Sequence, residues 1–201
     1  MQQYGHVGFK WLGLLGLSLF ASLALGSDFL SPAPAAFLPQ GLLGIQLGDN
    51  FEKSKGLAAL SELTCQGAEA EALSLFDEVC FFQMADSSRV AGAPIHDGFI
   101  VGKAHRVILV GTGISVKNAE DPQADAVIAS FQSQIHVLYQ HRGSHVLFAD
   151  MPKQKMTDTE LQDYAQRLPV LLVQLEAPGT ELAVLYGYLA PVNAFESIAS
   201  D

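Results

Sequence analysis

Two cysteines constrain this chain more than any other feature, because a bond between them would fix where the chain folds back on itself. Cys65 and Cys80 are the only cysteines in 201 residues. An even cysteine count in an exported protein is typical of a disulfide. The spacing is wider than the Cys-x-x-Cys motif of redox enzymes, and metal ligation is a further alternative. We expect a structural disulfide that joins the end of a first helix to the first long strand.

The N-terminal residues predict export, and disulfides form and persist mainly in exported proteins. Residues 11–25 form a run of apolar or small residues without a charge, and Lys10 precedes the run. Ala24-Leu25-Gly26 then places small residues where a signal peptidase cleaves. Residues 1–26 are therefore predicted to be a signal peptide, and the mature protein to be periplasmic or extracellular. Because a bilayer-spanning helix needs about 20 apolar residues, a retained anchor over residues 7–25 is the alternative.

The balance of charge narrows the classes of partner. The chain has 21 Asp and Glu residues against 11 Lys and Arg, a net charge of −10, and signal cleavage would remove one Lys and no acid. Nucleic acid and anionic lipid are disfavoured, because both require clustered Lys and Arg. A basic protein partner is favoured instead. The alternative is that the charge only keeps an exported protein soluble.

Composition divides the rest of the chain into three parts. Residues 27–41 contain Pro32, Pro34 and Pro39 and are predicted to be a Pro/Ala-rich linker. Residues 42–190 have the apolar periodicity of a single folded domain. Residues 191–201 lack periodicity and are predicted to be a flexible tail.

Three helix starts and one turn have clear local signals. Asp49 with Glu52, and Thr157 with Glu160, fit the capping box. Asp121 is a candidate N-cap before Pro122 at the first helical position. Gly102-Lys103 is predicted to be a type II′ hairpin turn.

Periodicity around these signals predicts strands, hairpins and helices in an order typical of the α+β class. Helices do not alternate strictly with strands, so we expect a mainly antiparallel sheet with about three helices packed on one face and one disulfide. The expected elements are a strand at 43–47, a helix at 49–63, strands at 73–84, 98–101 and 105–116, a helix at 121–142, a strand at 145–149, a helix at 157–168, and a final hairpin of 170–176 with 181–190.

A short motif at the start of the domain resembles a known repeat. Gly44-Ile45-Gln46-Leu47-Gly48 before a capped helix is similar to the opening of the repeat in β-lactamase-inhibitor-like bacterial envelope proteins. The resemblance implies a helical segment followed by a short antiparallel sheet.

Motifs for catalysis and metal binding are weak. Val110-Gly111-Thr112-Gly113 follows a strand but lacks the third glycine of a dinucleotide fingerprint, so we expect a turn or bulge there. His141 and His145 would share one side of a helix, the spacing of zinc ligands, with Asp150 as the nearest acid. A histidine near a helix C-terminus is also explained by the helix dipole. No cofactor is predicted.

Acidic residues near predicted strand ends are the remaining candidates. Asp86, Asp97 and Asp150 lie at such positions, where sites often form. Asp86, Asp97 and Glu120 are candidate rim charges facing a basic partner. Three functions follow as hypotheses: an exported non-catalytic envelope module that inhibits, neutralises or escorts a basic protein; a membrane-anchored accessory subunit of a membrane complex; and an exported hydrolase with a His or carboxylate site.

Overall fold

A computed structural model describes the folded part of the chain. The described residues are 38, 40–56, 61–68, 75–85, 88–117, 121–135, 138–142, 145–149, 157–176 and 181–199. The predicted signal peptide and nearly all of the predicted linker lie outside them. No helix within these ranges is long and apolar enough to cross a membrane.

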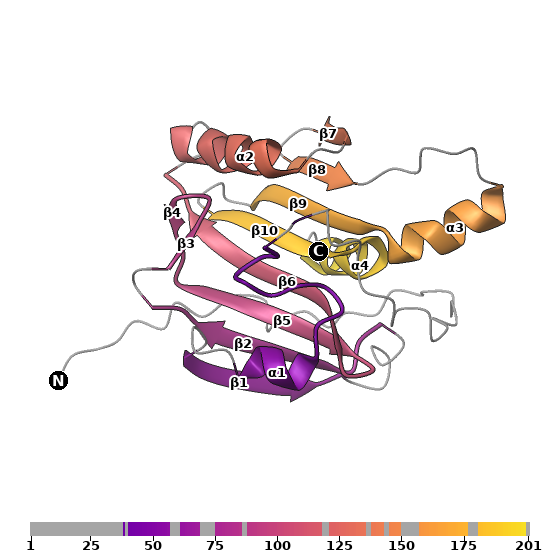
Figure 1. The fold of residues 1–201 in the computed structure, drawn as a ribbon. Helices are drawn as coiled ribbons and strands as arrows, with labels where there is room; N and C mark the ends of the chain where they lie inside the picture. Colours follow the sequence, from indigo (N-terminus) through magenta and orange to yellow (C-terminus); the bar gives the residue numbers. More distant parts are fainter. Residues whose placement is uncertain are drawn as a thin grey trace.

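Eight antiparallel strands form the main sheet, in the order β1-β2-β5-β6-β10-β9-β8-β7 (Figure 1). The expected mainly antiparallel α+β fold is confirmed. A short pair, β3 with β4, stands apart from this sheet. The strands are β1 (Ser61–Gly67), β2 (Glu78–Gln83), β3 (Arg89–Val90), β4 (Ala93–Pro94), β5 (Asp97–Lys103), β6 (Arg106–Ser115), β7 (Leu138–Arg142), β8 (His145–Ala149), β9 (Pro169–Glu176) and β10 (Glu181–Tyr188).

The described residues contain four helices, one more than expected. Two predicted starts are confirmed: the Asp121 side chain accepts the Gln123 N–H, and Thr157 with Glu160 forms a complete capping box. The helices are α1 (Phe51–Lys55), α2 (Pro122–Gln134), α3 (Asp158–Arg167) and α4 (Leu189–Ala199).

The first predicted helix is much shorter than expected. Its N-cap is Asn50, which accepts the Lys53 N–H, and Gly56 is its C-cap. The predicted Asp49 cap is wrong, because the Asp49 carboxylate accepts the backbone N–H of Gln46 instead. Residues 61–67, predicted as the helix end in part, pair with β2 as a strand. The predicted strand at 43–47 is replaced by a turn with a Leu42–Ile45 bridge.

Two later boundaries also differ from the predicted ones. The helix predicted over 121–142 ends at Gln134, and Leu138–Arg142 pairs with β8 as the edge strand β7. The tail predicted from residue 191 is instead most of helix α4, in which Pro191 and Val192 are buried. Tertiary contacts thus override local propensity in these segments.

The β5–β6 hairpin turns at Ala104-His105 rather than at Gly102-Lys103. Lys103 pairs with Arg106, and both turn residues have positive φ, at 48° and 63°. Two positive φ values are those of a type I′ turn, which suits a two-residue hairpin loop. Gly102 has a different role, because a Cβ there would lie 2.7 Å from the Phe51 ring of α1.

The helices occupy both faces of the sheet, not one face as predicted. Lys55 of α1 contacts Glu78, whose face also carries Cys80, because alternate strand residues share a face. We call this the α1 face; α1 lies over it in Figure 1. A Cβ on Gly187 would lie 3.0 Å from Val192 of α4. Gly187 pairs with Leu109, Leu109 with Val101, and Val101 with Val79, so these residues share one face of the sheet. Val79 lies between Glu78 and Cys80 in β2, so this face is opposite to the α1 face. We call it the α4 face.

Candidate functional site: two acidic clusters

The predicted site residues are not brought together as a group. Asp97 begins β5 and is half-buried. Asp86, Glu120 and Asp150 lie outside the described residues. His141 and His145 lie on the paired strands β7 and β8, not on one helix, so the helical spacing that suggested a zinc site does not exist.

The structure places Glu181 beside Asp97 on the α4 face. Gly98 pairs with Thr112, which sets Asp97 alongside Gly113 of β6. Glu181, at the start of β10, extends its carboxylate over Gly113, where a Cβ would overlap its Oε1 atom. The Thr112 hydroxyl donates to the Asp97 backbone carbonyl at 2.6 Å and holds this end of β5. We call Asp97 and Glu181 the acid pair.

Burial raises the pKa of both members of the acid pair, and the charge of Asp97 adds to the effect on Glu181. Burial raises the pKa of Asp97, against the opposing effect of a charge on His96. Burial also raises the pKa of Glu181, and the negative charge of Asp97 raises it further. Among the described residues, neither carboxylate forms an ion pair with a basic side chain. Two half-buried like charges therefore lie near each other without an ion pair among the described residues, although a charge on His96 would partly offset that of Asp97.

A glycine in β6 makes room for the Glu181 carboxylate. Gly111 and Gly113 lie inside strand β6, so the predicted turn or bulge at this motif is wrong. On the α4 face their missing side chains are replaced by neighbours: the Phe99 ring and Leu185 cover Gly111, and the Glu181 carboxylate covers Gly113. Sequence reasoning missed Glu181 because its proximity to Asp97 depends on the register of three strands. The glycine alternation was the only local signal.

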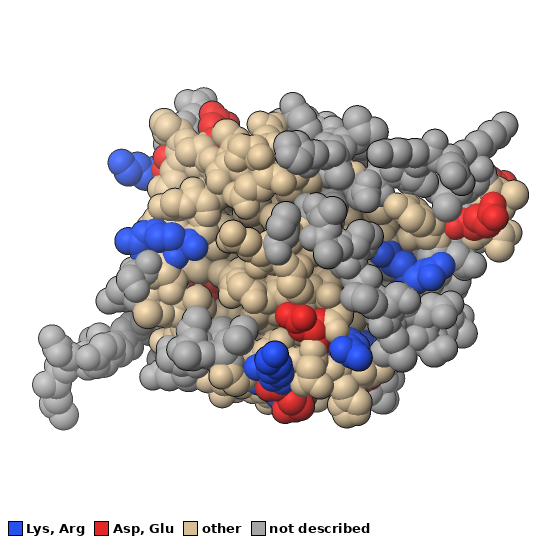
Figure 2. All heavy atoms as spheres, in the orientation of Figure 1, with Lys and Arg blue, Asp and Glu red and all other residues tan. Residues whose placement is uncertain are grey.

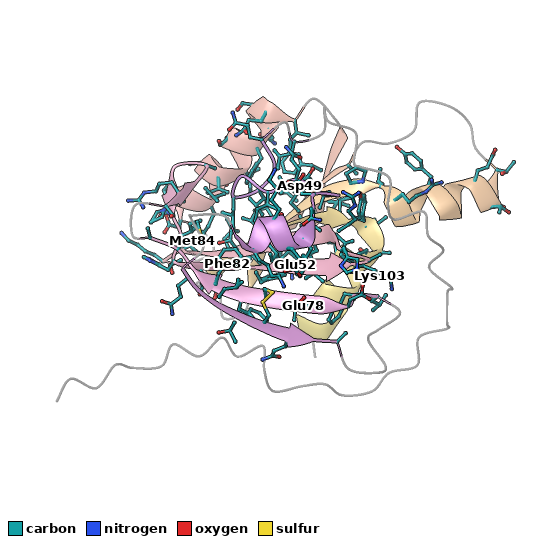
Figure 3. The ribbon with its side chains drawn as sticks, turned by 60° about the horizontal axis from the view of Figure 1, so that its bottom comes forward. Asp49, Glu52, Glu78, Phe82, Met84 and Lys103 are labelled. Atoms are coloured by element: carbon teal, nitrogen blue, oxygen red, sulfur yellow. A yellow bond between two sulfur atoms is a disulfide. The ribbon has the colours of Figure 1, made fainter. Side chains whose placement is uncertain are left out.

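A second cluster lies on the α1 face and contains a lysine between its two acids. Lys55 Nζ lies 2.8 Å from Glu52 and 3.2 Å from Glu78, and 5.1 Å from the centre of the Phe51 ring. The hydrogen bond with Glu52 is the main cause that raises the pKa of Lys55. We call Lys55, Glu52 and Glu78 the lysine cluster; Figure 3 labels its two acids, with the disulfide beside Glu78.

The predicted disulfide between Cys65 and Cys80 is confirmed, but it joins different elements from those expected. The two residues are cross-strand partners in β1 and β2, with Cα atoms 4.0 Å apart. The bond therefore fastens the edge strand β1 to the sheet instead of tying a helix end to a strand. Cys80 is fully buried, whereas Cys65 is exposed.

No family model, curated protein or solved structure matches this chain. The similarity of Gly44–Gly48 to the β-lactamase-inhibitor-like repeat therefore stays a short local likeness.

The described charged residues on the side of the molecule where α1 lies do not form one acidic surface (Figure 2). Figure 2 shows that, on the side where α1 lies, charged residues of both signs are scattered among uncharged ones. The described part of this side shows no broad acidic area. The formal negative charge of the chain is therefore not displayed there as one surface, whereas the acid pair concentrates two negative groups at one place on the α4 face.

Proposed function

We propose that the protein is an exported, non-catalytic binding module that holds a cationic side chain of a basic protein partner at the acid pair. The supporting observation is that Asp97 and Glu181 lie near each other, half-buried, and that neither forms an ion pair with a basic side chain among the described residues. Asp97 is also one of the rim charges that the sequence predicts.

A cation from a partner would relieve the strain that burial imposes on these acids. Each carboxylate loses part of its hydration, and each raises the free energy of the other charge. A guanidinium group can donate to two carboxylates at once and is weakly hydrated, so Arg suits this position better than Lys. The net charge of −10 would add long-range attraction of a basic partner and raise the association rate.

Export is the second part of this proposal. It is supported by the signal-like segment at residues 1–26 and is compatible with the disulfide. Mass spectrometry of the intact, exported protein should show loss of residues 1–26. Full-length chain recovered from the membrane fraction would favour the anchored accessory subunit instead.

The same acid pair also supports a second candidate, the exported hydrolase. Two neighbouring carboxylates with raised pKa values are the groups that general acid–base catalysis uses. In that case Asp97→Asn would abolish turnover of a substrate. In the binding module, the same substitution would weaken a complex without any turnover to lose.

Binding of a basic probe tests the leading proposal. Calorimetry would compare an arginine-rich peptide with the same peptide in which citrulline replaces arginine. We expect the arginine peptide to bind, the citrulline peptide to fail, and the affinity to fall as salt rises. The double variant Asp97→Asn/Glu181→Gln should lose at least about tenfold in affinity, because a charge-assisted contact contributes roughly 1.5–3 kcal/mol.

Glu52→Gln is the matched control, because it removes one acid from the α1 face and leaves the acid pair intact. Its affinity for the arginine peptide should equal that of the wild type. Equal losses in both variants would show that only overall charge matters, and the proposal would fail. The association rate of a natural partner, once identified, should also fall between low and physiological ionic strength.

A further inference from the structure

We propose that reduction of the Cys65–Cys80 disulfide creates a site for a thiophilic divalent metal ion such as Zn²⁺, with Cys65, Cys80 and Glu78 as its ligands. Both sulfur atoms and a Glu78 carboxylate oxygen lie within 4.8 Å of one another. The Cys80 sulfur is 3.6 Å from Glu78 Oε1. Two thiolates and a carboxylate are ligands that zinc accepts, and three protein ligands leave a fourth position for water.

The sheet holds the three ligands in place independently of the bond between the sulfurs. Cys65 and Cys80 are cross-strand partners, and Glu78 precedes Cys80 by two residues on the same face. Zinc holds each sulfur at about 2.3 Å, so the two sulfurs would move apart by rotation of their side chains once the bond between them is broken. The ladder between β1 and β2 can therefore stay paired while the ligands change from a disulfide to a metal site.

The exposure of the two sulfurs decides how reduction would proceed. Cys65 is exposed and lies on the edge strand β1, whereas Cys80 is fully buried. A thiolate of a dithiol reductant would attack the Cys65 sulfur, form a mixed disulfide and release Cys80 as a thiolate. The second thiol of the reductant then attacks its own bonded sulfur and releases Cys65. The protein disulfide gains two electrons, and the reductant leaves as a disulfide.

Lys55 couples the site to helix α1. Its Nζ atom lies 3.2 Å and 3.3 Å from the two carboxylate oxygens of Glu78. In the oxidised protein this contact keeps the Glu78 carboxylate beside the sulfurs. A bound metal ion would compete with Lys55 for Glu78, while Glu52 remains at 2.8 Å as the other partner of Lys55. Metal binding would thus shift Lys55 from two acids to one.

Cobalt provides the test, because Co²⁺ occupies zinc sites and gives a thiolate-to-metal charge-transfer absorption. The whole protein would be reduced with a phosphine, desalted without oxygen and titrated with Co²⁺ and then Zn²⁺. We expect the reduced protein to bind one ion with this absorption, and the oxidised protein to bind none. Glu78→Gln should weaken binding at least about tenfold, since even an outer-shell partner is worth that much.

Glu52→Gln is the control, because Glu52 contacts the same Lys55 but is not one of the ligands. Its affinity for the metal should match that of the wild type. The proposal is overturned if the reduced protein binds no ion, if Glu78→Gln binds as well as Glu52→Gln, or if urea-unfolded reduced chain binds as tightly as the folded protein. If reduction unfolds the chain, Zn²⁺ should restore the native circular dichroism spectrum, and failure to do so would equally overturn it.

Discussion

The lysine cluster and the acid pair each bring two carboxylates together, yet they leave them in opposite electrostatic situations. Glu52 and Glu78 share Lys55, whose Nζ atom lies within 3.2 Å of an oxygen of each. Asp97 and Glu181 are two like charges near each other, and burial raises the pKa of both. The first arrangement is complete within the chain. The second is the one that a cation from outside would complete.

The difference follows from where the two clusters lie in the fold. A helix covers the α1 face beside β1 and β2, and its last turn supplies Lys55 above Glu78. At the acid pair, glycine at position 113 leaves space that a carboxylate fills. An acid set over a glycine of a central strand is a costly arrangement for stability alone. This contrast is why we place the binding function at the acid pair and assign the lysine cluster a structural role in the oxidised protein.

The disulfide beside the lysine cluster should give the largest effect. Cys80→Ser opens a loop with a sequence separation of 15 residues and should lower the free energy of unfolding by roughly 2–5 kcal/mol. Urea unfolding of the air-oxidised proteins measures this loss. The acid pair, on strands that the bond does not join, should keep its titration behaviour.

The double variant Cys65→Ser/Cys80→Ser controls for the thiol that Cys80→Ser leaves behind. It should be destabilised by a similar amount. Two reactive thiols in native, air-oxidised wild-type protein would contradict the disulfide itself.

The two glycines of β6 should differ, although they are two residues apart on one face. In Gly111→Ala the new methyl group would overlap the Phe99 ring and lie 2.9 Å from Leu185. Both neighbours are only 7% exposed, so such overpacking should cost about 1–3 kcal/mol. In Gly113→Ala the methyl group meets the mobile end of Glu181, which can turn away at little cost.

Thermal and urea unfolding of these two variants would sharpen the comparison of the clusters. Gly113→Ala should also weaken binding of the arginine peptide, because it displaces one carboxylate of the acid pair. A loss of stability as large for Gly113→Ala as for Gly111→Ala would show that Glu181 is firmly packed, and would argue against an acid held ready for a partner.

Local signals in the sequence predicted most elements but not their boundaries. Asp121-Pro122 and the Thr157–Glu160 capping box marked two helix starts correctly, because the capping groups lie within one turn of the groups they satisfy. The helix expected to extend to residue 63 and the one expected to extend to residue 142 both failed. Residues 61–67 and 138–142 are strands only because β2 and β8 pair with them.

The candidate sites could likewise be predicted where local chemistry determines them, and not where the strand order does. The disulfide could be predicted because cysteine chemistry allows few alternatives in a chain that is predicted to be exported. Asp97 was identified as a charged residue near a strand end, but Glu181 was not connected with it. Their approach depends on the order β5-β6-β10, which brings residues far apart in sequence together across a central strand. No local pattern in a single sequence specifies that strand order.

Neutralising the acid pair should stabilise the protein by a modest amount. At neutral pH, Asp97→Asn/Glu181→Gln removes two like charges that burial disfavours, and should raise the free energy of unfolding by roughly 0.5–1 kcal/mol. The size of this effect depends on pH. Because the folded pKa values are raised, the folded protein binds these protons more tightly than the unfolded chain, so wild-type stability falls as pH rises.

The loss in the wild type should begin near the ordinary pKa values, 3.8 for Asp and 4.5 for Glu, and be complete above the raised folded values. The double variant lacks these groups, so its advantage should vanish in acid and reach its maximum near neutral pH. Urea unfolding of both proteins across this range provides the measurement. An advantage that is constant with pH would mean that the acid pair does not titrate as we infer.

The smallest effect should come from Glu52→Gln in the lysine cluster. Glu52 is exposed, and Lys55 retains Glu78 when the Glu52 charge is removed, so the free energy of unfolding should fall by no more than about 0.5 kcal/mol. Glu78→Gln is the informative partner, because Glu78 is half-buried beside Cys80 and should cost more. The comparison predicts opposite signs: removing an acid from the lysine cluster destabilises, and removing one from the acid pair stabilises. If Glu52→Gln and Glu78→Gln instead stabilised the protein at neutral pH, Lys55 would not be compensating its two acids, and the distinction between the two clusters would be lost.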